Sequence, residues 1–270
     1  MKASFAALWG VLAIIVSPCG HAADESLESI ESRGLAQKFI LTRPSGNPIA
    51  NVILLPGGHG RLGLDSFSGA VSMAWGKDNN LVRTRDAYAD QGFLVATMDA
   101  PSDRGKMNAI WRMGEQHARD IASVAAELRR RANAPVWVIG TSMGSFSAAN
   151  AGIRLKDTID GIVLTSSITR SKPSWSIRDE YPDGVINMAL DQVTAPVMVI
   201  SHADDRCALT PPTDLDRLAA GFSSAVRVEK VLFTGADRAR SDPCQALSPH
   251  GFIGIENDVV LRISAFIKAD

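Results

Sequence analysis

The sequence predicts an α/β protein in which a parallel β-sheet is covered by helices on both faces. Two observations carry this prediction. Short, almost continuously apolar segments recur along the chain, and segments with helical spacing of apolar residues separate them. Strands that are apolar throughout are typical of a parallel sheet buried on both faces. Right-handed crossovers then place a ligand site at the carboxyl ends of the strands.

The expected strands end at turn-forming residues. Residues 36–42 (AQKFILT) precede a Pro-Ser-Gly turn, and residues 51–55 (NVILL) stop at a proline that opens a glycine-rich loop. Residues 93–98 (FLVATM) end at Asp-Ala-Pro. Proline and glycine interrupt strands, whereas β-branched and aromatic residues favour them. Later segments with the same pattern cover 135–139, 161–164, 196–200 and 227–233.

The helices are recognised by the spacing of their apolar residues. In 115–131, Ala118, Ile121 and Leu128 are among residues three or four positions apart that share one helix face. Shorter helices are expected at 145–155, 214–220 and 258–267. Residues 168–192 form the longest stretch between clear strands, and we interpret them as a short lid or an excursion over the site.

Composition excludes several classes of protein. The chain has 28 basic and 29 acidic side chains and a net charge of −1, which argues against binding to nucleic acid or to an acidic membrane. Hydrophobic residues make up 46% of 270 residues, enough to order a globular core. No linker rich in proline, glycine or serine divides the chain, so a single domain is expected.

The first residues have the pattern of a secretory signal peptide. Lys2 is followed by an apolar run over 5–16 and by small residues up to Ala22, after which we predict cleavage. A membrane anchor is disfavoured because a span needs about 20 apolar residues. A lipoprotein is disfavoured because Pro18 precedes Cys19. We therefore expect residues 1–22 to be removed, residues 23–270 to form one domain without stable membrane insertion, and the protein to be periplasmic or secreted.

Export bears on the cysteines. Cleavage leaves Cys207 and Cys244, and an oxidising compartment favours a disulfide between them over two free buried thiols. No paired-cysteine zinc spacing and no His-Glu-x-x-His motif is present, so no metal site is predicted.

A Gly-x-Ser-x-Gly motif occupies residues 140–144, between an expected strand and an expected helix. It follows the strand 135–139 and precedes the helix 145–155. In a nucleophile elbow of this kind the serine sits on a strained turn, and small residues two positions away on each side let strand and helix approach. Ser142 is therefore the candidate nucleophile; the alternative is a glycine-rich strand–helix turn without chemistry.

A serine nucleophile needs a base, and the base needs an acid that orients it. In a strand–elbow–helix architecture the chain order is serine, acid, histidine. Asp204 and Asp205 both follow the strand 196–200, and His250 follows the strand 227–233 and precedes the last helix. His202 lies on the loop of the two aspartates, so we interpret it as a packing residue rather than the base.

From residue 51 onward the chain resembles the α/β-hydrolase superfamily. The stretch 201–205 is similar to that family's His-Gly-x-x-Asp loop, with Pro211 following, and 248–252 (SPHGF) is similar to its catalytic histidine segment. The resemblance implies a mostly parallel central sheet with helices on both faces and a short lid region. It also implies a triad of Ser142, Asp205 and His250, with Asp204 as the reserve acid.

The glycine-rich loop after residue 55 resembles the family's His-Gly-Gly-Gly segment, with proline in place of the histidine. The resemblance implies that the backbone N–H groups of Gly58 and Met143 form an oxyanion hole. His59 is the alternative to Gly58. Glycine there lets a backbone N–H approach a substrate oxygen closely.

The same loop also matches Gly-x-Gly-x-x-Gly at residues 58–63, a dinucleotide-binding fingerprint. This oxidoreductase reading is disfavoured because no clean helix follows and the next strand ends at Asp99, too far along the chain for the acidic partner. No cofactor is expected.

His117 is expected on a helix surface. Trp111 and Arg112 either line the substrate pocket or are solvated residues at a helix start, and solvation is favoured for Arg104 and Lys106.

The sequence thus predicts an exported serine hydrolase that cleaves carboxylic esters of a small acyl substrate through an acyl-enzyme. The alternatives are an amidase, peptidase or thioesterase that uses the same triad, and a non-catalytic binding protein with a hydrolase-like fold.

Overall fold

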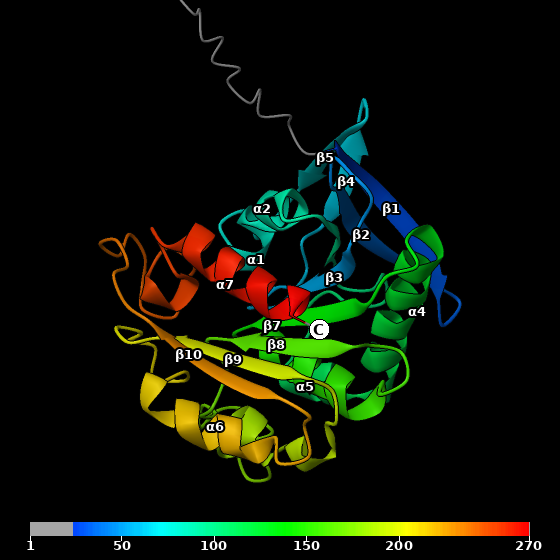
Figure 1. Cartoon of the computed structure of the whole chain (residues 1–270). Helices are drawn as coiled ribbons and strands as arrows, with labels where there is room; N and C mark the ends of the chain where they lie inside the picture. The colour runs from blue at the N-terminus through cyan, green and yellow to red at the C-terminus, as the bar shows by residue number, and fades with distance from the viewer. Residues whose placement is uncertain (1–23, 270) are drawn as a thin grey trace, which may run out of the picture.

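The computed structural model describes residues 24–269 (Figure 1). The expected signal peptide at 1–22 lies outside the described residues and stays a prediction. Within the described part of the chain, no helix has both the length and the apolar character needed to cross a membrane.

A large β-sheet forms the centre of the described chain. Its eight strands are ordered β1-β2-β6-β3-β7-β8-β9-β10. The pairs β1–β2 and β2–β6 are antiparallel, and every other neighbouring pair is parallel, which confirms the mostly parallel sheet. The strands are β1 (Asp24–Ser32), β2 (Leu35–Arg43), β3 (Ala50–Leu55), β6 (Phe93–Met98), β7 (Val136–Thr141), β8 (Gly161–Thr165), β9 (Val197–His202) and β10 (Val228–Phe233).

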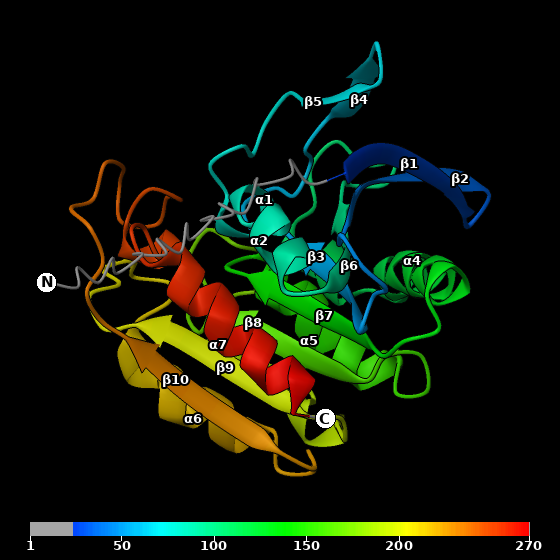
Figure 2. The same cartoon turned by 45° about the horizontal axis from the view of Figure 1, so that its top comes forward.

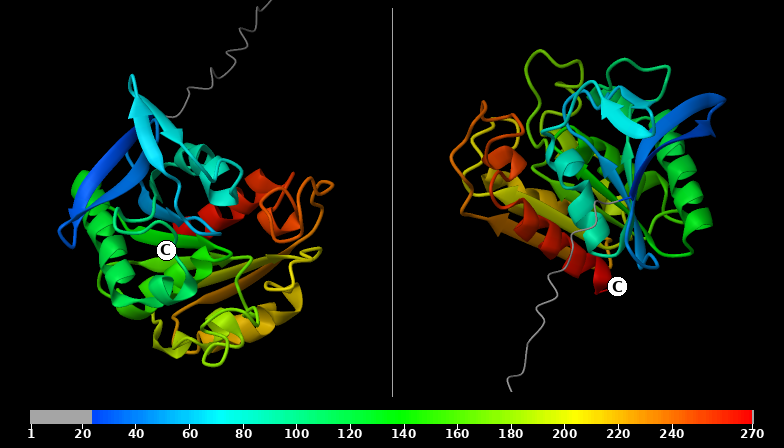
Figure 3. Two further views of the ribbon diagram at one scale, coloured as in Figure 1. Left: turned by 180° about the vertical axis from the view of Figure 1, so that it is seen from behind. Right: turned by 90° about the horizontal axis from the view of Figure 1, so that it is seen from above.

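Helices cover both faces of this sheet (Figure 2). One face packs against α3 (Ala109–Met113), α4 (Glu115–Arg131), α5 (Gly144–Arg154) and α6 (Leu215–Gly221), and Figure 3 shows α4 beside β1. The other packs against α1 (Asn80–Arg83), α2 (Arg85–Asp90) and α7 (Glu256–Lys268).

Strand β3 shows why the central strands are apolar throughout. Side chains alternate between the two faces of a sheet. Ile53 and Leu55 belong to the core on the α5 side, whereas Val52 and Leu54 belong to the core on the α7 side. Both faces are dry, so no position in the strand is suited to a polar side chain.

Every strand and helix expected from the sequence is present, most with ends shifted by one or two residues. The sequence patterns missed strand β1, one hairpin and the three short helices α1, α2 and α3. Strand β1 was not expected because DESLESIES contains only two apolar residues, Leu27 and Ile30, and lies at an edge of the sheet. The hairpin β4 (Leu64–Phe67) and β5 (Ala70–Met73) forms a separate two-stranded sheet that projects from the body (Figures 1 and 2).

Residues 168–192 are an irregular segment anchored to the core. They contain 3₁₀ turns at Gly184–Asn187 and Leu190–Gln192. The N–H of Val185 donates to the carbonyl of Ile168 at 2.9 Å, and both side chains are buried in the core on the α5 side. The segment is therefore an excursion closed on itself, and its expected role as a lid stays a prediction.

Packing between β7 and β8 generates a stability prediction. A Cβ on Gly161 would lie 2.2 Å from the ring of Trp137, which is buried between the sheet and α7. We expect Gly161→Ala to lower the free energy of unfolding by about 1–3 kcal/mol, the usual cost of overpacking. Gly46→Ala is the matched control because nothing lies within 4 Å of a Cβ there. Urea unfolding of both variants measures the difference, and equal stabilities would contradict the packing argument.

Candidate active site

The Gly-x-Ser-x-Gly motif forms the expected turn between β7 and α5. Ser142 has a φ of 52°, in the left-handed region. A Cβ on Gly140 would lie 2.2 Å from the carbonyl oxygen of Gly144, and one on Gly144 would lie 2.1 Å from that of Leu55. Both positions therefore require glycine, and the strained turn presents Ser142 at the carboxyl edge of the sheet.

The structure brings Asp205 and His250 together. His250 lies in a 3₁₀ turn, Pro249–Gly251, and its Nδ1 is 2.9 Å from Asp205 Oδ2. Both side chains are buried. Thr210 Oγ1 donates to the same carboxylate oxygen at 2.8 Å and lies 3.1 Å from His250 Nδ1, and the N–H of Cys207 donates to Asp205 Oδ1 at 2.9 Å.

The reserve acid and the second histidine lie elsewhere. Asp204 is exposed, and its backbone N–H donates to Nδ1 of His202. His202 is fully buried and packs edge-on against Phe252, as expected of a packing residue. Of the two aspartates on this loop, Asp205 is the one that contacts His250.

Backbone contacts fix the segment that carries His250. Ser166, itself at a φ of 42°, donates through Oγ to the carbonyl of His250 at 2.8 Å. The carbonyl of Gly251 accepts from Asn80 Nδ2 at 3.1 Å and from Arg83 Nη2 at 2.6 Å. No sequence motif marks these residues, because they act only through contacts that the fold creates.

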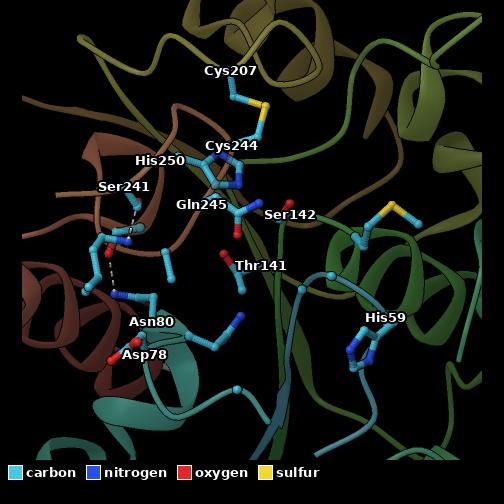
Figure 4. A pocket seen from close by; sticks show the side chains of 18 of the residues that line it. His59, Asp78, Asn80, Thr141, Ser142, Cys207, Ser241, Cys244, Gln245 and His250 are labelled. Atoms are coloured by element: carbon cyan, nitrogen blue, oxygen red, sulfur yellow. Dashed lines mark hydrogen bonds between the residues drawn. A yellow bond between two sulfur atoms is a disulfide. The ribbon is translucent and has the colours of Figure 1, made fainter. Parts of the chain in front are cut away.

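Ser142 and His250 line one cavity of about 750 Å³ (Figure 4). Its wall also includes Gly58, Met143 and Trp175. The structure, which describes both residues, has no hydrogen bond between Ser142 Oγ and the His250 ring. Such contacts are often long in free enzymes and tighten when substrate binds.

The glycine-rich loop after β3 closes one side of this cavity. A Cβ on Gly57 would lie 3.0 Å from Ser142 Cβ, so the loop approaches the candidate nucleophile closely. Gly58 has a φ of 58°, and a Cβ there would lie 2.7 Å from the ring of Trp75. Within residues 24–269 the N–H groups of Gly58 and Met143 donate to no other group. Two unpaired donors therefore lie beside Ser142.

The chain is similar in sequence and structure to known hydrolases. A family model described as serine aminopeptidase, S33, matches residues 80–203. Est1E from Butyrivibrio proteoclasticus has a similar structure at a TM-score of 0.61 and 13% identity, over 90% of this chain and 98% of that one. Together with the elbow and the sheet order, these similarities identify the fold. The chain has the α/β-hydrolase fold.

Two further structures show how widely this fold is shared. The dienelactone hydrolase from Anabaena variabilis matches at a TM-score of 0.61 and 13% identity, over 92% of this chain and 99% of that one. The dipeptidyl peptidase 4 from Porphyromonas gingivalis matches at 0.61 and 12%, over 93% of this chain but 36% of that one. No curated protein sequence matches the chain.

In this α/β-hydrolase fold the expected disulfide is present. Cys207 and Cys244 are bonded to each other and line the cavity with His250. The bond joins the loop of Asp205 to the loop of His250, and it closes a sequence separation of 37 residues. Among residues 24–269, no group of three or more histidine, cysteine and carboxylate side chains is arranged to hold a metal ion.

Two expectations about buried polar residues were wrong. Arg112 neither lines the cavity nor reaches solvent; it is fully buried, with Nη1 2.9 Å from Ser147 Oγ. His117 is buried rather than on a helix surface, because the face of α4 that carries it packs against α5, where Nε2 lies 2.9 Å from Ser147 Oγ. Arg104 and Lys106 are exposed, as expected.

Burial of His117 predicts how stability depends on pH. Burial, together with the positive charges of Arg112 and Arg33, lowers its pKa from 6.5 to about 3. Below pH 6.5 His117 therefore binds a proton in the unfolded chain but stays neutral in the folded chain. The free energy of unfolding falls as the pH is lowered from about 6.5 to about 3. His117→Gln keeps a hydrogen-bonding side chain without this titration.

Urea unfolding at pH 7 and pH 5 tests this. We expect the wild type to lose on the order of 2 kcal/mol more than His117→Gln over that range. Equal losses in the two proteins would show that His117 does not contribute to acid sensitivity.

Proposed function

We propose that the protein is an exported serine hydrolase that cleaves carboxylic esters through an acyl-enzyme. Ser142 is the nucleophile, His250 the general base and Asp205 the acid that orients it. The observation that carries this proposal is the buried Asp205–His250 contact at 2.9 Å, which borders the same cavity as the strained Ser142. If the turn at Ser142 had only a structural role, no hydrogen-bonded pair of Asp205 and His250 would be expected beside it.

The contacts of His250 suit a base. The carboxylate of Asp205 is an acceptor, and Thr210, which donates to that carboxylate, offers a lone pair to Nδ1. These partners favour the tautomer with the proton on Nδ1. Nε2 is then free to take the proton of Ser142 Oγ, and Asp205 stabilises the imidazolium that results.

The reaction proceeds in two halves. Ser142 Oγ attacks the ester carbonyl while His250 takes its proton, and His250 returns that proton to the departing alcohol as the acyl-enzyme forms. A water molecule, deprotonated by His250, then attacks the acyl-enzyme, and the carboxylic acid product leaves as His250 returns the proton to Ser142 Oγ. The N–H groups of Gly58 and Met143 stabilise the oxyanion in both halves, with His59 as the alternative to Gly58. One such donor is worth about 3 kcal/mol of barrier.

Two candidate activities, ester hydrolysis and amide hydrolysis, differ in the type of acyl bond that is cleaved. An ester is favoured because the similar structures include a dienelactone hydrolase and a Pyrococcus furiosus esterase. A peptide or other amide is the second candidate, because the matching family model is described as serine aminopeptidase. A small acyl substrate suits the short excursion at 168–192, of which Ile168 and Trp175 reach the cavity wall.

Export is proposed on two observations. The first residues have the pattern of a signal peptide, and the disulfide between Cys207 and Cys244 is of a kind that persists in oxidising compartments. Periplasmic and secreted locations both satisfy these observations.

A fluorophosphonate probe tests for an activated serine. We expect one adduct per chain, on Ser142, and none on Ser142→Ala or His250→Ala, measured by intact mass and by the labelled peptide. Ser66→Ala, an exposed serine of the β4–β5 hairpin, should label like the wild type. No adduct on folded, disulfide-bonded protein would favour the binding protein instead.

Steady-state kinetics then test the acid and the bond type. With a p-nitrophenyl ester, Asp205→Asn should lower kcat about 10⁴-fold, as expected when the base is left in the wrong tautomer. Asp204→Asn is the matched control and should stay close to wild type. Faster turnover of the corresponding p-nitroanilide than of the ester would replace the esterase by an amidase.

The disulfide generates a further prediction. In the chain-entropy model a loop of this length contributes roughly 3–4 kcal/mol, so Cys207→Ser/Cys244→Ser should melt roughly 10 °C lower. If the bond also holds Asp205 and His250 in place, kcat per folded molecule falls as well. Unchanged kcat at a temperature where the variant is folded would leave general stabilisation as its role.

A further inference from the structure

The guanidinium of Arg112 lies behind the loop that contains the candidate oxyanion hole. Nη2 donates to the carbonyl of Pro56 at 3.0 Å and to that of Gly58 at 3.3 Å. Gly60 closes over the group, since a Cβ there would lie 2.4 Å from Nη2. From the opposite side Nη1 donates to Ser147 on α5. The loop 56–60 therefore packs directly against the guanidinium of Arg112 and is hydrogen-bonded to it.

This charge has no counter-ion in the described part of the chain. Nothing but burial shifts the pKa of Arg112, which falls to about 9 and leaves the group mostly charged at neutral pH. Its Nε has no hydrogen-bond partner within residues 24–269. The neighbour reached through Ser147 is His117, which is neutral at pH 7. An unpaired buried charge destabilises a fold, so its presence favours a role in function over a role in stability.

The contacts of Arg112 determine how the loop presents its donors. In a trans peptide the C=O and N–H groups point in opposite directions. The carbonyls of Pro56 and Gly58 face Arg112, so the N–H groups of Gly57 and His59 point away from it. The N–H of Gly58 belongs to the peptide between them. Both candidate donors of the loop, Gly58 and His59, are thus fixed by one side chain.

We infer that Arg112 is a positioning residue of the oxyanion hole, which fixes the donors of loop 56–60 and places a positive charge behind them. This inference rests on the proposed function. In the resting protein the charge is uncompensated. During the reaction, negative charge develops on the substrate oxygen, which lies against the same loop, and this charge is the missing counter-ion. A preorganised positive charge of this kind stabilises the transition state and leaves the affinity for the substrate almost unchanged.

Arg112→Gln tests the inference because it removes the charge and the fork but keeps a polar side chain. We expect kcat for the ester to fall about 10- to 100-fold with KM within about twofold, the pattern of a lost transition-state interaction. The affinity of an alkylboronic acid, which forms a tetrahedral anion on the serine, should fall by a similar factor. Arg129→Gln, a partly exposed arginine at the far end of α4, is the matched control.

A merely structural role predicts the opposite pattern. It lowers the melting temperature and leaves kcat per folded molecule unchanged, and that result would overturn the inference. We expect the melting temperature of Arg112→Gln to equal or exceed that of the wild type, because a buried unpaired charge is removed. If this variant does not fold, Arg112→Lys keeps the charge without the fork; we expect a smaller loss of kcat, and wild-type kcat would overturn the inference.

Backbone mobility measured by ¹⁵N relaxation separates this inference from the proposed function. Arg112→Gln should lower the order parameters of the backbone amides of residues 57–60, whether or not a substrate is known. If the wild type hydrolyses esters but the variant keeps kcat and these order parameters, Arg112 is not a positioning residue and the proposed function stands. If the wild type neither labels nor hydrolyses, the proposed function fails, and the order parameters at 57–60 still decide whether Arg112 holds the loop.

Discussion

The close approach of β3, β7 and α5 is the constraint on which the rest of the site depends. A methyl group on Gly140 or Gly144 would collide with backbone carbonyls, so these three elements meet with no side chain between them. That contact forces Ser142 into a left-handed turn and brings the loop after β3 within reach of it. The candidate nucleophile and the candidate oxyanion donors are thus consequences of one packing contact rather than separate features.

The candidate acid and base depend on a different set of contacts. Asp205 and His250 lie on long loops after β9 and β10. Thr210 contacts both side chains, Ser166 Oγ donates to the His250 carbonyl, and the disulfide links the two loops. The two halves of the site are therefore built in different ways. Backbone packing of the sheet positions Ser142, whereas side-chain hydrogen bonds between loops, which a disulfide also links, connect Asp205 and His250.

The sequence predicted those parts of the molecule whose cause is local. Apolar runs identified the central strands, and the glycines of 140–144 identified the elbow. Strand β1 was not predicted because this edge strand has only two apolar residues, Leu27 and Ile30, and so lacks that apolar signal. Arg112 and His117 were misplaced because local charge suggests solvent, and nothing near them in sequence shows that α3, α4 and α5 enclose them. Thr210 was missed for the same reason: its role exists only where two loops meet.

The order of the proposed triad along the chain has a consequence for synthesis. Ser142 and its turn belong to the middle of the sheet, but both of its partners follow residue 200, and His250 is reached after the last strand. Helix α7, which follows His250, also supplies Phe266 to the core around Trp137. A chain emerging from the ribosome thus contains its candidate nucleophile long before its candidate base. On the proposed function, hydrolysis begins only after almost the whole chain has been made and the segment that leads into α7 has folded.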